Sequence, residues 1–191
     1  MRTKKGEAGY IRSRKTLLMI VVLLEFALVG GLVFVGYKTT GTRRNLLTLV
    51  AILGCLPACR TLVNLIVMAP YHSINEAREL EIAGVTGNLT VLYDLILTSE
   101  RKSMPIQSIA IYNRTVCGYV SDKRIDTHYA ARHIKSMLAQ EKLDKVTVKL
   151  FTDYTAFLAR AEGMDNIASV EQEDNSRIER KISRLLLDIS L

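Results

Sequence analysis

The sequence predicts an α/β protein anchored by two N-terminal transmembrane helices, and three observations lead to this fold class. Two apolar runs, residues 17–36 and 46–71, are each long enough to cross a hydrocarbon core of about 30 Å. From residue 72 onward the composition is that of a soluble domain. In that part, helix-like and strand-like segments follow one another in the order helix, three strands, helix, strand.

Both apolar runs are better explained by a membrane than by a soluble core. A core helix of a soluble protein shows a polar stripe at helical spacing, and neither run has one. A cleavable signal peptide is the alternative for the first run, but its apolar part is too long and no small-residue cleavage site follows it. We therefore expect residues 17–71 to form a transmembrane hairpin that follows a basic cytosolic tail at residues 1–16.

The basic charge of the chain lies next to the membrane. Residues 1–44 hold nine Lys and Arg against Glu7 and Glu25, which accounts for the whole net charge of +7, whereas residues 45–191 hold seventeen residues of each sign. Six basic residues precede the first helix and three lie in the connector, which favours a cytoplasmic N-terminus. Two spans then return the chain to the cytoplasm. Membrane lipid is the expected partner, and no nucleic-acid binding is expected.

Three polar side chains interrupt the apolar runs: Glu25 in the first, and Arg60 and Asn64 in the second. An unpaired charge in hydrocarbon costs several kcal/mol, so such residues usually face a partner or water. Counting from the connector places Arg60 about one turn from the level of Glu25. We expect the two to form an ion pair within the hairpin, or the long Arg60 side chain to extend its charge to the membrane interface. Alternatively, Glu25 and Arg60 pair with helices of other chains in a membrane complex.

The elements of the soluble domain, residues 72–163, are predicted from caps and periodicity. Ser73 to Glu76 resembles a capping box that opens a helix to about residue 83. Residues 89–98 read as a strand, and residues 106–112 and 115–121 read as a hairpin joined by Asn113-Arg114. A helix to about residue 142 starts at Asp126 or Thr127, a strand follows at 146–152, and Asp153 caps a short helix.

The C-terminal part is predicted as a detached helix. Residues 164–175 are polar and follow Gly163, so we expect a linker there. Residues 176–191 then form an amphipathic helix. Its apolar stripe docks on its own domain or binds a partner or second copy. The stripe consists of Ile178, Ile182, Leu185, Leu186 and Ile189.

The stretch LYDLILTSERKSMPIQSIAIYNRTVCGYV resembles the nuclease-related domain family, which has a restriction-endonuclease-like core. The resemblance covers about residues 73–153 and rests on element order and a loose pattern. It implies a divalent-metal site with an acid on the second strand and Glu-x-Lys on the third. These positions fall on Gln107, Tyr119 and Ser121, so all three are changed. The resemblance therefore implies a degenerate member without metal, cofactor or catalysis.

One rival set of nuclease-type residues remains in the sequence. Glu100-Arg101-Lys102 matches Glu-x-Lys, and Asp94 precedes it by six residues, but the set falls in a polar connector where solvated charges are expected. We expect a membrane-anchored interaction or regulatory module. The alternatives are a membrane-tethered Mg²⁺-dependent nuclease, if Asp94, Glu100 and Lys102 act together, and an accessory subunit of a membrane complex.

Overall fold

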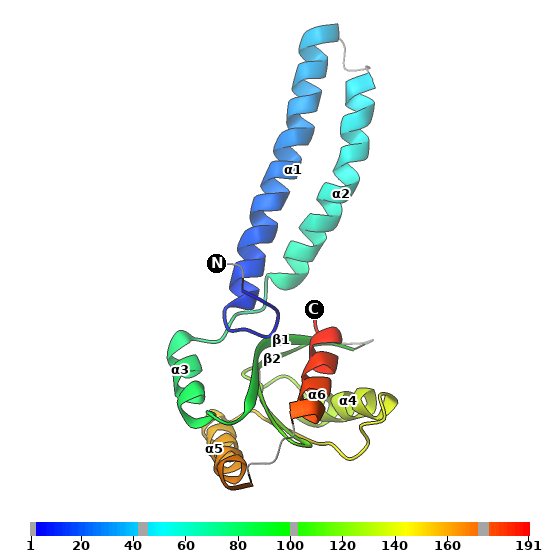
Figure 1. The fold of residues 1–191 in the computed structure, drawn as a ribbon. Coiled ribbons are helices and arrows are strands. Elements are labelled where there is room, and N and C mark those ends of the chain that lie inside the picture. The colour runs from blue at the N-terminus through cyan, green and yellow to red at the C-terminus, as the bar shows by residue number, and fades with distance from the viewer. Residues whose placement is uncertain (1–2, 42–45, 100–102, 172–175) are drawn as a thin grey trace. The chain divides into compact units, whose positions relative to one another are not determined.

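The structure, a computed structural model, describes residues 3–41, 46–99, 103–171 and 176–191. It is mixed α/β, as predicted, with six helices and a four-stranded sheet in the described ranges (Figure 1). The chain divides into two compact units. One is formed by residues 11–72, and the other by residues up to Tyr10 together with residues 73–191.

The first unit consists of two helices, α1 (Tyr10–Thr40, with its first residue in the second unit) and α2 (Leu46–Met68). Both are long and apolar enough to cross a membrane by length and composition, and only 17% and 11% of their most apolar windows are buried. Small residues on α2 let it approach α1 closely, as in membrane helix pairs. Ala51 and Ala58 are buried, and a Cβ on Gly54 would lie 3.3 Å from Cγ2 of Val29.

Lys15 joins the start of α1 to the chain that leaves α2. Its Nζ donates a hydrogen bond to the carbonyl of Ala69 at 2.7 Å and another to the carbonyl of Tyr71. Both carbonyls lie just beyond the C-terminal end of α2, where the helix dipole makes a positive charge favourable. The bonds fix the two helices at the end where the chain enters and leaves the hairpin.

The second unit is built on a sheet with the strand order β1-β2-β3-β4. Its strands are β1 (Thr90–Thr98), β2 (Ser103–Tyr112), β3 (Thr115–Tyr119) and β4 (Thr147–Phe151). The β1–β2 and β2–β3 pairs are antiparallel, and β3–β4 is parallel. Asn113, at φ 50°, begins the predicted two-residue turn between β2 and β3.

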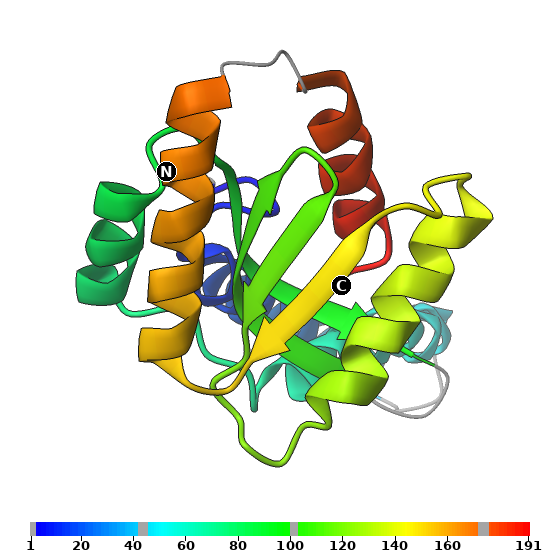
Figure 2. The ribbon, with the colours of Figure 1, turned by 90° about the horizontal axis from the view of Figure 1, so that it is seen from below.

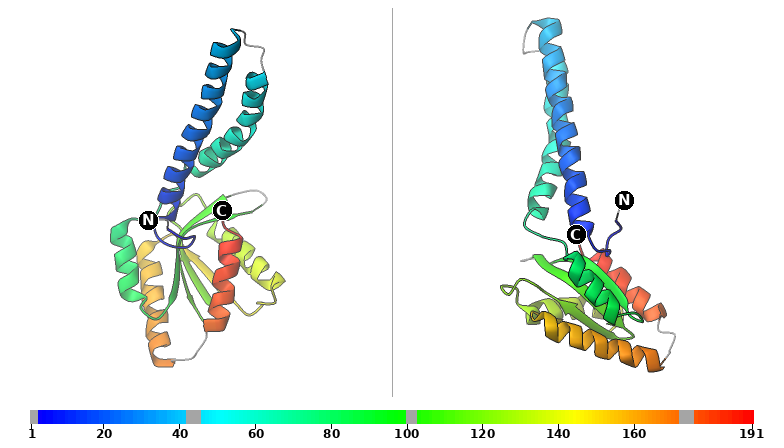
Figure 3. Two further views of the ribbon diagram at one scale, coloured as in Figure 1. Left: turned by 45° about the horizontal axis from the view of Figure 1, so that its top comes forward. Right: turned by 90° about the vertical axis from the view of Figure 1, so that its left-hand side faces the viewer.

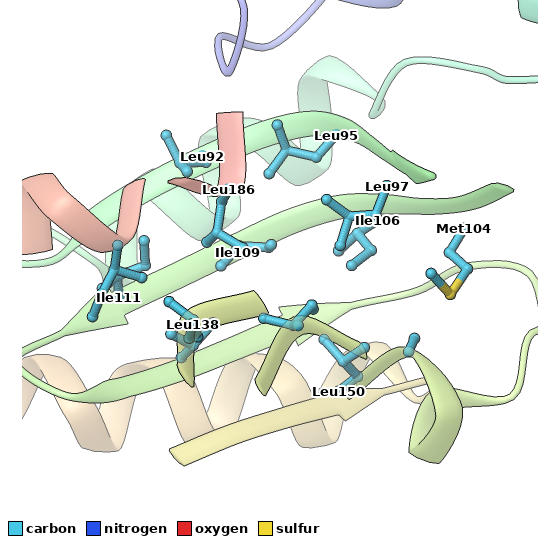
Figure 4. Close-up of a cluster of buried hydrophobic side chains, with 14 of the residues drawn as sticks. Leu92, Leu95, Leu97, Met104, Ile106, Ile109, Ile111, Leu138, Leu150 and Leu186 are labelled. Atoms are coloured by element: carbon cyan, nitrogen blue, oxygen red, sulfur yellow. The ribbon is translucent and has the colours of Figure 1, made fainter. Parts of the chain in front are cut away.

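Helices cover both faces of this sheet (Figures 2 and 3). One layer contains α3 (Glu76–Val85) and α5 (Tyr154–Glu171), and the other contains α4 (Thr127–Gln140) and α6 (Ser176–Asp188). The α4/α6 side holds a large aliphatic core that includes Leu95, Ile109, Leu138 and Leu186 (Figure 4). The α3/α5 side holds a smaller core centred on Phe157, which is fully buried.

Both ends of the chain cover the exposed edge of β1. The backbone N–H of Tyr93 donates to the carbonyl of Gly6 at 2.8 Å, and the N–H of Leu191 donates to the carbonyl of Ile96 at 2.9 Å. Gly6 has φ +90°, and a Cβ there would lie 2.8 Å from a methyl of Leu187. An edge strand with free backbone groups invites aggregation, so the termini protect it. Residues 3–10 are therefore part of the folded domain rather than a free basic tail.

Lys5 shows how closely this N-terminal segment is packed. Its Nζ donates to the carbonyl of Ser190 at 2.5 Å. Burial lowers the pKa of Lys5, and the negative charge of Asp188 partly opposes that effect. The segment thus contacts the C-terminal end of α6 through both apolar and polar groups.

Two predicted boundaries differ from the structure. The helix after Asp153 does not end at Gly163 but continues to Glu171, so the first eight residues of the predicted linker at 164–175 are helical. The reason is that Met164 and Ala168 continue the buried face begun by Phe157, and this packing outweighs the single glycine. Helix α3 is capped by Asn75, whose Oδ1 accepts from the N–H of Ala77, rather than by the predicted Ser73.

Candidate functional site

The positions at which the resemblance places metal ligands lie on the central strands. Gln107 is half-buried on β2, Tyr119 is 5% exposed at the end of β3, and Ser121 is exposed beyond it. In the described part of the chain, Oε1 of Gln107 is buried without a hydrogen-bond partner. An amide, a phenol and a hydroxyl are weak ligands for a hard divalent cation.

Asp94 lies across from Gln107, where the β1–β2 ladder is interrupted. The pairs Tyr93–Ser108 and Leu95–Ile106 enclose the two residues, and Asp94 has φ 54°. Its side chain is 3% exposed, and Oδ1 accepts the N–H of Ile74 at 2.8 Å. The carboxylate therefore positions the chain just before α3.

Of the rival set, only Asp94 lies within the described residues, since Glu100 and Lys102 fall in the gap at 100–102. Among the residues that the structure describes, no group of three or more His, Cys, Asp or Glu is placed to hold a metal ion. Asp94 is thus the one carboxylate of this set that the structure places.

A cluster of polar and aromatic side chains surrounds Tyr119, and we call it the tyrosine cluster. It consists of Arg78 and Glu81 from α3, Tyr119 from β3, and Tyr154 and Phe157 from α5. The rings of Tyr119 and Tyr154 meet edge to face at 5.3 Å, and the ring of Phe157 lies 6.0 Å from that of Tyr119. The cluster lies at the carboxyl end of β3 and just beyond the carboxyl end of β4.

Arg78 is the charged centre of the tyrosine cluster. Its guanidinium carbon lies 4.9 Å from the ring centre of Tyr154 and 5.8 Å from that of Tyr119, and Nη1 donates to Oη of Tyr119 at 3.3 Å. The OH of Tyr154 donates to Oε2 of Glu81 at 2.7 Å. These contacts fasten α3 to α5 and to the end of β3.

The tyrosine cluster holds one guanidinium, that of Arg78, and one carboxylate, that of Glu81. A guanidinium beside Tyr119 repels a divalent cation at the position where the resemblance implies one. Burial, followed by the hydrogen bond to Glu81, raises the pKa of Tyr154 well above its usual value. Tyr154 therefore stays protonated at neutral pH and donates a hydrogen bond instead of acting as a base.

The polar residues of the two long helices are arranged differently from the predicted ion pair. The hydroxyl of Thr61, not Arg60, donates to Oε1 of Glu25 at 3.3 Å, and Oε2 of Glu25 is buried with no partner among the described residues. Arg60 and Asn64, one helical turn apart on α2, are both exposed. The carboxylate is thus turned toward the helix pair, and Arg60 and Asn64 are turned away from their own hairpin.

The apolar stripe of the C-terminal helix is used inside the domain. Ile182 and Leu186 are fully buried, and Ile178, Leu185 and Ile189 pack against the same core. Glu179, 8% exposed, accepts from the hydroxyl of Thr90 at 2.7 Å and from the N–H of Asn113 at 2.9 Å. The apolar residues that we predicted as an interaction surface are therefore occupied by contacts with the chain itself.

Sequence reasoning missed Arg78, because it lies in no motif, and it did not join Arg78 to Tyr154, because 75 residues separate the two in the chain. Only the fold brings them to the end of β3, so no local signal identifies the tyrosine cluster. Comparisons with protein-family models, curated proteins and solved structures found no match to this chain.

Proposed function

We propose that this chain is a membrane-anchored interaction or regulatory module. The α1–α2 hairpin holds the α/β domain at the cytosolic face of a membrane. The domain has the element order of the nuclease-related family, without that family's metal chemistry. The observation that carries this proposal is the tyrosine cluster, which places Arg78 and a buried phenol where a catalytic site would need carboxylates.

The membrane part of the proposal is supported by the way the domain uses both flanks of the hairpin. Residues 3–10 precede α1 and residues 73–191 follow α2, yet both belong to one compact unit. Two segments that fold together must lie on the same side of a membrane, which requires an even number of spans between them. The six basic residues before the first apolar run favour the cytosolic side over the three in the connector.

A cleavage assay on the full chain in nanodiscs tests whether the domain is catalytic. The substrates are single-stranded DNA, supercoiled plasmid and RNA, each with Mg²⁺ or Mn²⁺. We expect no cleavage above the buffer background, because the described metal-ligand positions carry no carboxylate. Failure of the chain to enter nanodiscs would contradict the membrane anchor separately.

Two variants decide what any observed cleavage means. Glu100→Ala removes the rival carboxylate, and Glu141→Ala removes an exposed carboxylate at the end of α4 as a matched control. Cleavage by the unmodified chain that disappears in Glu100→Ala and persists in Glu141→Ala would establish a membrane-tethered nuclease. That result would overturn the proposal.

A second candidate, an accessory subunit of a membrane complex, is favoured by the exposure of Arg60 and Asn64 on α2. Intramembrane polar residues usually face other helices or water, and here they face away from their own partner helix. The native mass of the protein in mild detergent separates a lone anchor from a subunit that retains other helices.

A further inference from the structure

The C-terminal helix α6 has two opposite faces, one buried and one exposed. Its apolar face is buried in the α4/α6 core. Its other face carries four exposed basic residues with the spacing i, i+3, i+4 and i+7, which places them together on one side of the helix. We call these residues, Arg177, Arg180, Lys181 and Arg184, the basic face of α6.

The described part of the chain does not neutralise this face. No described carboxylate lies within ion-pair distance of Arg177, Lys181 or Arg184, and the guanidinium of Arg180 hydrogen-bonds only to Ser176. The helix has two acidic residues of its own. Glu179 points into the domain toward Thr90 and Asn113, and Asp188 lies close enough to Lys5 to affect its pKa.

Only a short segment separates the residue that packs against α6 from the first membrane helix. Gly6 packs against Leu187 near the end of α6, and α1 begins at Tyr10. Residues 6–9 form turns before the helix begins at Tyr10, and even fully extended they would span at most about 14 Å. The helical residues from Tyr10 to Leu17 add about 10 Å. The segment from Gly6, which packs against α6, to Leu17, the first residue of the apolar run in α1, therefore spans at most about 25 Å.

We propose that the basic face of α6 binds the anionic phospholipid headgroups of the membrane that holds the hairpin. This inference rests on the membrane anchor proposed above and adds a second, electrostatic attachment. Phosphate groups complement the exposed guanidinium and ammonium groups, and basic residues near an anionic leaflet attract it. The anchor keeps headgroups at a high local concentration, which a soluble nucleic acid or a soluble protein does not share.

The test measures the reactivity of Lys181 in the full chain in nanodiscs. An amine-reactive ester labels the protein in discs of phosphatidylcholine alone or of phosphatidylcholine with phosphatidylglycerol, and mass spectrometry reads each lysine. We expect the labelling rate of Lys181 to fall at least about threefold in the anionic discs at low salt, and to recover in 1 M salt because surface charges are then screened. Exposed Lys145, after α4, is the internal reference and should not change.

Two triple variants keep Lys181 as the reporter. Replacing Arg177, Arg180 and Arg184 by Gln should abolish the protection by anionic lipid. Replacing Arg114, Lys123 and Arg160 by Gln removes three exposed charges from other elements and should preserve that protection. The circular dichroism of both variants should match that of the unmodified chain, since none of the six side chains is buried.

The outcomes separate this inference from the proposed function. A chain that does not enter nanodiscs contradicts the anchor and, with it, this inference. A chain that enters discs but labels equally at Lys181 with and without phosphatidylglycerol contradicts this inference alone. Protection by an added oligonucleotide in neutral discs, without protection by phosphatidylglycerol, would assign the face to nucleic acid and overturn the lipid proposal.

Discussion

The two helical layers on either side of the sheet carry opposite charge. Helices α3 and α5 hold six acidic and two basic residues, whereas α4 and α6 hold six basic and two acidic residues. The sum over residues 45–191 is zero, so the total charge concealed this separation. A domain with no net charge can therefore still have a basic surface, because the fold places most basic residues of these helices on one side of the sheet.

The layers also differ in how they are held to the sheet. The α4/α6 side is fixed by a continuous aliphatic core, with Glu179 as a buried charge in α6. The α3/α5 side has a smaller core and depends in addition on the tyrosine cluster and on single hydrogen bonds, such as that from Tyr112 to Glu171. We therefore expect the two sides to respond differently to loss of apolar and of polar contacts.

The largest expected effect comes from truncating one core residue in each layer. Phe157→Ala should lower the free energy of unfolding by about 3–5 kcal/mol and Leu186→Ala by about 2–5 kcal/mol, because both side chains are fully buried. Hydrogen exchange read by mass spectrometry should show faster exchange across both layers in each variant, since they share the sheet. Val170→Ala, at an 82% exposed position, is the control and should change stability by less than about 0.5 kcal/mol.

Faster exchange confined to α6 in Leu186→Ala would contradict the single cooperative unit. It would instead support the helix detached by a linker that the sequence analysis predicted. The domain would then consist of a stable core and a helix α6 that docks on it independently.

Most elements of this fold were predictable from local pattern, and the exceptions are contacts between distant residues. The turn at Asn113-Arg114 and the strands around it follow from alternation and from an asparagine that tolerates positive φ. Helix α5 was predicted too short because the polar and acidic residues after Gly163 indicated a linker, although Met164 and Ala168 among them continue the buried face of the helix. Local pattern thus located the elements better than it located their ends.

The candidate site was much less predictable than the fold. The packing of Gly6 against Leu187, the approach of Arg78 to Tyr154 and the burial of Glu179 all join segments that no motif links. The spacing of the basic residues in α6 can be seen in the sequence. That these residues form an exposed face follows only once the apolar stripe is known to be buried in the domain. That stripe was identified correctly, and its occupation by the domain itself was left open.

An intermediate effect is expected from the carboxylates that fasten each layer. Glu179→Ala leaves the N–H of Asn113 and the hydroxyl of Thr90 without their acceptor at a partly buried place, so it should cost about 1–3 kcal/mol. Glu171→Ala removes the acceptor of Tyr112 at an exposed position that water can fill, and should cost less than about 1 kcal/mol. Urea unfolding followed by circular dichroism measures both.

The conservative variant Glu179→Gln separates a hydrogen-bonding role from a role of charge. An amide can still accept from Asn113 and donate to Thr90, so it should recover part of the stability lost in Glu179→Ala. Equal losses of unfolding free energy in Glu179→Ala and Glu171→Ala would show that the buried carboxylate of α6 contributes no more to stability than the exposed carboxylate of α5.

The smallest expected effect is a difference in acid sensitivity between two helix caps. Asp126 caps α4 by accepting the N–H groups of Tyr129 and His128, and these bonds lower its pKa below the ordinary 3.8. Its folded-state pKa lies below its unfolded value, so the stabilisation is present above pH 3.8 and disappears as the pH falls through the folded pKa. Asn75, which caps α3, does not titrate.

Acid should therefore loosen the first turn of α4 before the first turn of α3. Hydrogen-exchange protection factors of the first-turn amides, measured from about pH 5 down to about pH 2, read this difference below the ordinary carboxyl pKa. Asp126→Asn keeps a capping side chain without a titrating group, so in that variant the α4 amides should keep their protection as the pH falls. Equal loss of protection in the unmodified chain and in Asp126→Asn would mean that other carboxylates control acid unfolding, and that the caps do not distinguish the layers.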